Sequence, residues 1–122
     1  GAQAYQGVTT AGFPNLFMLY GPNTNQGSLI TMIEWEVDHA LAHIRRLVTE
    51  NLAWIDVKAD RQAAYNEQLQ KDIGSVEAWA DGCNNYYSAP SGRVVTQWPK
   101  NMSAYRDMVL EIDPDAYEVA SR

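Results

Sequence analysis

The sequence predicts an α/β fold, which as an isolated piece is an α+β unit of helices and short strands. Two observations indicate it. The continuous apolar run from Leu16 to Tyr20 is typical of a strand buried on both faces, and turn-forming Gly21-Pro22-Asn23 follows it. Apolar residues then recur at three- and four-residue spacing from Leu29 to Val48, which predicts a long helix. A chain of 122 residues is one domain at most.

The long helix has a predicted N-cap at Ser28 and a predicted end at Glu50-Asn51, where Asn51 tolerates a left-handed conformation. We expect its apolar stripe to face the core. The stripe consists of Ile30, Ile33, Val37, Leu41, Ile44 and Val48. His39 and His43 lie on the opposite face, so we expect both histidines to be exposed to solvent.

Shorter patterns predict the other elements. Residues Tyr5 to Thr10 suit either a short strand or an extended arm, and Thr10-Ala11-Gly12 suits a turn. A strand is predicted over Ala53–Val57, and a second helix, capped by Asp60, follows it and ends at Gly82-Cys83. The inner face of that helix is predicted to contain Tyr65, Leu69, Ile73, Val76 and Trp79. We then expect a hairpin of Asn84–Tyr87 with Arg93–Gln97, a helix from an N-cap at Ser103 to Val109, and a turn at Asp113.

Composition narrows the classes of function. The net charge is -6 and no basic cluster is present, which argues against a nucleic-acid partner. No apolar run reaches the ~18 residues of a membrane span, and no leader pattern is visible. The single Cys83 cannot form an internal disulfide, which fits a reducing compartment. We therefore expect a cytoplasmic location.

No catalytic or metal site is predicted from the residues themselves. His39 and His43 have the spacing of a metal pair, but Ala40 follows the first histidine and no third ligand is near. Glu34, Glu36 and Asp38 form a group of carboxylates near the start of the helix, and the helix dipole explains the first of them at least as well as acid/base chemistry would. Cys83 suits a buried structural thiol better than a nucleophile. Neither a dinucleotide-binding glycine fingerprint nor a P-loop occurs.

The aromatic residues of the second half leave two interpretations open, an aromatic pocket or an ordinary core. These residues are Trp79, Tyr86, Tyr87 and Trp98.

The block from Gly12 to Asn25 (GFPNLFMLYGPNTN), followed by Met32-Ile33-Glu34, resembles the C-terminal part of flavin-dependent Baeyer–Villiger monooxygenases of the 4-hydroxyacetophenone monooxygenase-like branch. Later matches occur in the right order. They are Ala64-Tyr65-Asn66, Trp79, Gly82-Cys83, Tyr86-Tyr87, Ser91-Gly92-Arg93 and Trp98-Pro99. The resemblance runs from about Ala4 to Glu118, although the turn from Asn25 to Ser28 is shorter than in many relatives.

The resemblance implies a larger enzyme with two Rossmann-type domains that bind FAD and NADPH. Residues 1–52 would end the FAD-binding domain, and residues 53–122 would form a C-terminal helix-hairpin-helix extension. The residues implied to approach the flavin are Gly21, Pro22, Asn23, Thr24, Ser28 and Leu29. The partners would be the remainder of the enzyme and a small ketone, with no nucleic acid or membrane.

The chain alone is expected to be inactive and to hold no FAD, because it has no Gly-x-Gly segment to seat the pyrophosphate. We expect the isolated piece to self-associate through surface that the missing domains would cover, at Leu16–Tyr20, Met32 and Trp35. The alternative is a small non-catalytic binding or oligomerisation module.

Overall fold

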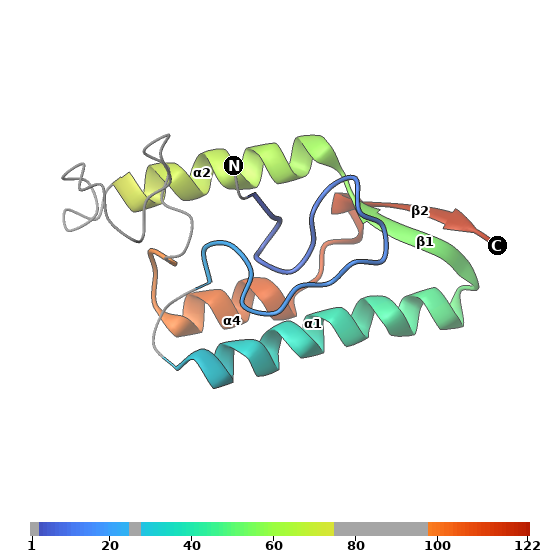
Figure 1. The fold of residues 1–122 in the computed structure, drawn as a ribbon, viewed down its shortest axis with the longest axis horizontal. Helices are drawn as coiled ribbons and strands as arrows, with labels where there is room; N and C mark the ends of the chain where they lie inside the picture. Colours follow the sequence, from blue (N-terminus) through green and yellow to red (C-terminus); the bar gives the residue numbers. More distant parts are fainter. Residues whose placement is uncertain (1–2, 25–27, 75–97) are drawn as a thin grey trace.

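The computed structural model describes residues 3–24, 28–74 and 98–122. Its elements in chain order are α1 (Leu29–Thr49), β1 (Leu52–Val57), α2 (Ala59–Gly74), α4 (Met102–Leu110), the 3-10 turn η1 (Pro114–Ala116) and β2 (Tyr117–Ser121). Figure 1 shows α4 lying along α1, with α2 on the other side of the N-terminal segment and the two strands at one end. This arrangement confirms the expected α+β piece.

The N-terminal segment, residues 3–24, fills the space between α1 and α2 (Figure 1). Its first part is a tight turn in which the Tyr5 N–H donates to the Thr9 carbonyl at 2.7 Å. The Ala4 carbonyl accepts from the Asn66 side chain of α2 at 2.7 Å, and the Ala11 N–H donates to Gln62 at 2.7 Å. This irregular segment therefore forms the centre of the molecule, where its backbone groups find partners on the surrounding helices.

Two apolar clusters hold the described elements together. The first joins the N-terminal segment, α1, α2 and α4 through Val8, Met32, Leu69, Ile73, Trp98, Tyr105 and Val109. The second lies beside the sheet and contains Tyr5, Ile55, Val57, Ala116 and Tyr117. The side chains of Leu69 and Ile73 are buried, which confirms these two members of the predicted inner face of the second helix. Its further members Val76 and Trp79, the helix end at Gly82-Cys83 and the hairpin of 84–97 lie outside the described residues.

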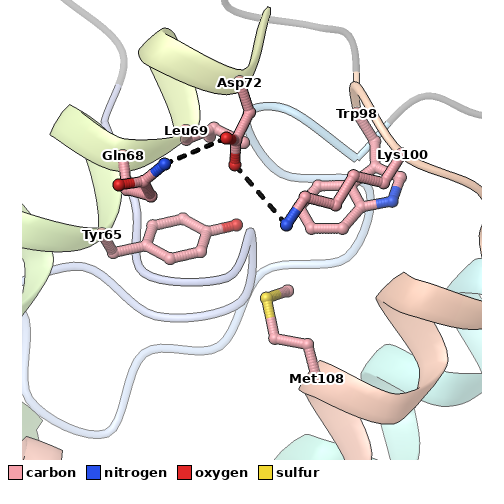
Figure 2. Close-up of a pocket in the computed structure, with 7 residues that line it drawn as sticks. All are labelled: Tyr65, Gln68, Leu69, Asp72, Trp98, Lys100 and Met108. Carbon is pink, nitrogen blue, oxygen red and sulfur yellow. Dashed lines mark hydrogen bonds and ion pairs between the residues drawn. The ribbon is translucent and has the colours of Figure 1, made fainter.

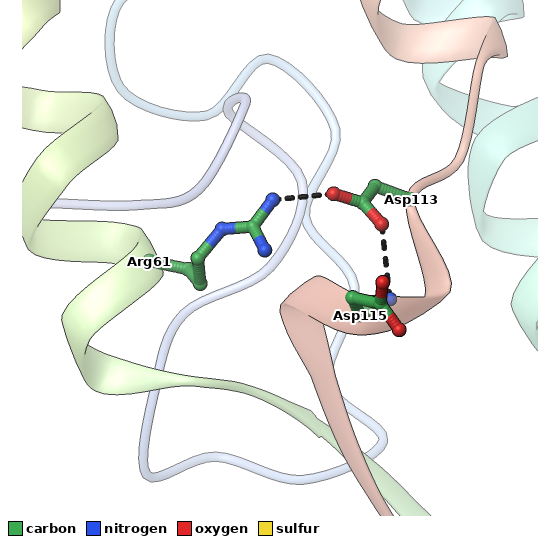
Figure 3. Close-up of polar contacts among 3 residues, drawn as sticks. All are labelled: Arg61, Asp113 and Asp115. Atoms are coloured by element: carbon green, nitrogen blue, oxygen red, sulfur yellow. Dashed lines mark hydrogen bonds and ion pairs between the residues drawn. The ribbon is translucent and has the colours of Figure 1, made fainter.

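β1 and β2 form an antiparallel pair in which Ile55 lies opposite Val119 and Val57 opposite Tyr117. The sequence predicts β1 within one residue, since Ala53–Val57 was expected, but it does not predict β2. At the end of this pair, Arg61 of α2 forms an ion pair with Asp113, whose carboxylate also accepts from the Asp115 N–H at 3.0 Å (Figure 3). The expected turn at Asp113 is confirmed and links α2 to the sheet.

The expected strand over Leu16–Tyr20 is wrong. The segment has no regular secondary structure, Tyr20 has a φ of 56°, and Leu19 is 49% exposed. Its N–H groups go to separate partners: Met18 donates to Val8 O at 2.7 Å and Tyr20 to the Glu36 carboxyl at 2.8 Å. A strand needs a neighbour along its length, and no described strand lies beside this run.

The helix α1 confirms the predicted bounds and caps, but the predicted inner face is wrong. Ser28 accepts from the Thr31 N–H at 3.4 Å, and Asn51 has the left-handed φ of 53°. Four members of the stripe expected inside are exposed, with Ile30 at 73% and Val48 at 75%, and the other two, Ile33 and Val37, are half-buried. The buried side chains are Met32, Glu36, His39, Ala40 and His43.

Two predicted helix starts are shifted. The second helix starts at Ala59, so Asp60 lies in its first turn rather than at the cap. The helix α4 is capped by Asn101 and not by Ser103, because the Asn101 side chain accepts from the Ala104 N–H at 2.8 Å. Both residue types are good caps, and the one whose oxygen reaches a free amide of the first turn is the cap. Among the described helices, none is long and apolar enough to cross a membrane.

Candidate functional site

The loop Gly21–Thr24 and the start of α1 contain all the residues implied to approach a flavin. Gly21 and Pro22 are half-buried, whereas Ser28 and Leu29 are exposed. The Asn23 and Thr24 side chains are buried, and the Thr24 hydroxyl donates to the Gly21 carbonyl at 2.8 Å. Gly21, Pro22, Ser28 and Leu29 are therefore accessible from outside, whereas the Asn23 and Thr24 side chains are covered by the protein.

Gly21 has a packing reason to lack a side chain. A Cβ on this residue would lie 2.1 Å from the Gly7 carbonyl oxygen. Gly7 itself has a φ of 75°, and a Cβ there would lie 2.1 Å from Thr24 Cγ2. Backbone approaches this close are open only to glycine. The turn of residues 5–9 therefore supports the Gly21–Thr24 loop from behind.

The start of α1 is accessible at its first residues. Leu29 and Ile30 are exposed, and helix geometry leaves their N–H groups without a carbonyl partner inside the helix. The positive end of the helix dipole favours negative charge on a neighbouring group. This end of the site can thus hold a carbonyl oxygen or an anionic group.

A buried carboxyl lies under the loop. Glu36, which is 0% exposed, accepts the Tyr20 N–H at Oε1 (2.8 Å), and its Oε2 lies 2.8 Å from the Tyr105 hydroxyl oxygen of α4. Burial raises the pKa of Glu36, although the bonds from Tyr20, Tyr105 and Thr24 oppose this rise. The sequence placed Glu36 only among helix-start carboxylates. Its partners Tyr20 and Tyr105 lie 16 and 69 positions away in the sequence, so no local sequence pattern predicts these contacts.

His39 and His43 are buried, so the expectation of solvent exposure is wrong. His39 Nδ1 lies 2.6 Å from the Val109 carbonyl, which can only accept, so Nδ1 carries the hydrogen. His39 Nε2 is then an acceptor, and His43 Nε2 lies 3.0 Å from it as the donor. The Tyr117 hydroxyl lies 3.3 Å from the same His39 nitrogen. The histidines thus join α1 to α4 and β2.

Both histidines are held neutral. Burial lowers the pKa of His39 and lowers that of His43 to about 3, and His39 and Arg46 add smaller electrostatic contributions at His43. The Phe17 ring stacks on His43 with centroids 5.7 Å apart, which covers the imidazole further. Within the described residues, no group of three or more His, Cys, Asp or Glu side chains could hold a metal ion.

Apart from the loop and the start of α1, a hollow lies between α2, α4 and the segment at Trp98. It measures about 170 Å³ and is lined by Tyr65, Gln68, Leu69, Asp72, Trp98, Lys100 and Met108 (Figure 2). Asp72 accepts from Gln68 at 3.0 Å and pairs with Lys100 at 3.5 Å on its rim. Among the residues that the structure describes, the buried Tyr65 hydroxyl has no hydrogen-bond partner. Trp98 contributes both to this hollow and to the core, and the other aromatic residues with two open interpretations, Trp79, Tyr86 and Tyr87, lie outside the described residues.

The sequence is similar to much longer monooxygenases. It is 39% identical over 124 aligned residues to a Baeyer–Villiger monooxygenase of Pseudomonas aeruginosa, covering 99% of this chain and 24% of that protein. It is 31% identical over 118 residues to an FAD-binding monooxygenase of Aspergillus niger, covering 92% of this chain and 19% of that protein. The chain thus spans about a quarter of the length of such relatives or less. No protein-family profile matches the chain.

The fold is also found in solved structures. Cyclohexanone monooxygenase from Rhodococcus sp. Phi1 bound to NADP+ superposes with a TM-score of 0.83 at 24% identity, over 99% of this chain and 24% of that one. The matching region is the C-terminal part of those proteins.

Proposed function

This chain belongs to the flavin-dependent Baeyer–Villiger monooxygenases, and we propose that the intact protein containing it uses FAD and NADPH to insert one oxygen atom into a ketone or to oxidise a soft heteroatom. The observation that carries the proposal is the 39% identity to the Pseudomonas enzyme over 99% of the chain. Because the chain spans a quarter of that relative, the activity requires the rest of the protein.

The part played by this chain is to position the flavin. A bound flavin supplies the redox chemistry, and the protein orients it and tunes its surroundings. Gly21 and Pro22 offer a backbone surface, while Ser28 and Leu29 begin a helix whose dipole favours the negative charge that a flavin gains on reduction. Residues 1–52 then complete the FAD-binding domain and residues 53–122 form the extension that braces it.

The outer face of α1 supports attachment to a larger protein. Ile30, Leu41, Ile44 and Val48 are exposed along one side of this helix, and we name this side the outer stripe. Each large aliphatic side chain gains about 1.5–3 kcal/mol on full burial. A stripe of four is therefore a substantial docking surface, and the remainder of the enzyme is the partner that we propose for it.

Substitution of the outer stripe tests this attachment. In the 122-residue chain, at a dilution where it is monomeric, we expect Val48→Glu to change the free energy of unfolding by less than about 0.5 kcal/mol, because Val48 is exposed in the monomer. In the intact protein, the same change should lower Tm and flavin content. Thr49→Glu, which puts the same charge on the neighbouring exposed residue, is the matched control. Equal effects of the two substitutions in the intact protein would contradict docking through the stripe.

Activity is tested on the intact protein and on the chain side by side. We expect flavin absorbance and ketone-dependent NADPH oxidation from the intact protein and neither from the chain. An intact protein without flavin would favour the rival function, a binding or oligomerisation module.

The isolated chain is proposed to self-associate, through a surface that differs from the sequence expectation. Met32 is fully buried and Trp35 is half-buried, so these two residues offer little surface for contact with a second copy. The surface that we propose for self-association is instead the outer stripe together with the exposed Leu16 and Leu19. Light scattering over a dilution series, with Val48→Glu beside the unchanged chain, measures this. A monomer at every concentration contradicts it.

A further inference from the structure

The Glu36 carboxyl gathers three separate parts of the chain. Its Oε1 accepts the N–H of Tyr20, the residue immediately before the Gly21–Thr24 loop, at 2.8 Å. Its Oε2 lies 2.8 Å from the hydroxyl oxygen of Tyr105 on α4. That hydroxyl oxygen also lies 2.9 Å from the carbonyl oxygen of Gln6, in the turn behind the loop. One carboxyl therefore links α1, α4, the loop and its supporting turn.

The protonation state of the Glu36 carboxyl follows from how many hydrogens are available to its short contacts. The Gln6 carbonyl can only accept, and the Tyr105 hydroxyl has a single hydrogen to donate. If Glu36 is ionised, both neighbours of the Tyr105 oxygen are acceptors, and one of two short O···O contacts has no hydrogen in it. If Glu36 is a carboxylic acid, its O–H donates to Tyr105 and Tyr105 donates to Gln6, so each of these two short contacts contains one hydrogen.

The surroundings of Glu36 favour the neutral form. It is 0% exposed, and burial is the main cause of its raised pKa. Among the described residues, the groups that face it are the Tyr20 N–H just before the loop, the Thr24 hydroxyl of the loop and the Tyr105 hydroxyl of α4, and none of these groups carries a charge. Burial also raises the pKa of Tyr105, so the phenol stays protonated and remains a relay for one hydrogen.

We propose that Glu36 is the positioning residue of the Gly21–Thr24 loop and that it holds the loop as a neutral carboxylic acid. Ionisation moves its proton to solvent, leaves two acceptors against one Tyr105 hydrogen, and loosens the contact between loop and supporting turn. The relevance to a flavin rests on the proposed function. A neutral carboxyl adds no negative charge beside a cofactor that gains negative charge on reduction.

The protonation state is measured directly by carbon-13 NMR of the Glu36 carboxyl in the 122-residue chain, with the Tyr20 amide shift recorded over the same pH series. We expect Glu36 to titrate above the ordinary glutamate value of about 4.3. The Tyr20 amide should move with the same midpoint, because it donates to that carboxyl. A midpoint at or below the ordinary value, or a Tyr20 shift that ignores it, would overturn the proposal.

Two variants separate positioning from simple packing. Glu36→Gln keeps a neutral group that accepts from Tyr20 and donates to Tyr105, so the Tyr20 amide should keep its low-pH position at all pH values. Glu34→Gln removes an exposed glutamate of the same helix and should leave the Tyr20 titration unchanged. A Tyr20 titration that persists in Glu36→Gln, or is lost in Glu34→Gln, contradicts the assignment.

These measurements need no flavin. If Glu36 titrates as expected but the intact protein holds no flavin, the proposed function is wrong and the assignment of Glu36 stands. A flavin-bearing protein whose Glu36 titrates ordinarily overturns this inference alone.

Discussion

The buried pair His39 and His43 should make the fold sensitive to mild acid. In the unfolded chain each imidazole has a pKa near 6.5, whereas burial lowers the pKa of His39 and lowers that of His43 to about 3. Above pH 6.5 both states are neutral and the histidines contribute no pH dependence. As pH falls below 6.5, the unfolded chain binds protons that the folded chain does not bind, so stability is lost.

The size of the effect follows from the shift at His43. Each pH unit between the two pKa values changes the free energy of unfolding by about 1.4 kcal/mol per group. From pH 6.5 to 4.5, His43 alone therefore removes on the order of 2 kcal/mol, and His39 acts in the same direction. A loss of this size is a large fraction of the ~5–15 kcal/mol that stabilises a typical domain.

Urea unfolding at several pH values measures this loss, and His43→Phe isolates the contribution of one ring. Phenylalanine keeps an aromatic ring against Phe17 and does not titrate. We expect about 1 kcal/mol lower stability at pH 7 from the lost bond to His39, but a shallower fall toward pH 4.5. Identical slopes for the two proteins, or a stability of the unchanged chain that is flat from pH 7 to 5, would refute the reasoning.

Three further results are expected from denaturation of single variants. Gly21→Ala should cost about 2 kcal/mol or more, because its Cβ meets Gly7 O at 2.1 Å, whereas Gly12→Ala has open space and should cost only the roughly 1 kcal/mol of its positive φ. Asn101→Ala should cost about 1 kcal/mol as the loss of a cap, and Ser103→Ala almost nothing. Tyr65→Phe should raise Tm, because it removes a buried hydroxyl without a partner; a lower Tm would show that this hydroxyl is bonded.

Local pattern was enough to predict several elements of the fold. The period of the apolar residues gave the bounds of α1, and the caps Ser28 and Asn51 are where their chemistry placed them. The β1 segment and the turn at Asp113 also follow from short-range signals. Each of these features depends on residues within a few positions of one another, which is the range over which sequence patterns carry information.

The interior of the candidate site could not be predicted in this way. His39 is buried because Val109, 70 positions later, offers a carbonyl, and Glu36 is buried because Tyr105 and Tyr20 reach it. The apolar period shows that α1 has two faces, but it does not say which face this chain covers. The turn at Gly21-Pro22-Asn23 was predicted from its residues, but its implied approach to a flavin came only from the family resemblance, since glycine, proline and asparagine are common to many turns.

The helix α1 has a polar inner face and an apolar outer stripe, the opposite of the predicted orientation, and each face has its own physical explanation. A polar inner face is stable here because every buried polar group that joins α1 to its neighbours has a hydrogen-bond partner from α4, β2 or the loop. The outer stripe needs no specific partner atoms, since apolar burial is non-directional. The inner face therefore fixes where the loop lies, and the outer stripe remains the surface that we propose for docking to the remainder of the protein. It follows that Val48→Glu should weaken docking without moving the Tyr20 amide, while ionisation of Glu36 should move Tyr20 without weakening docking through the stripe.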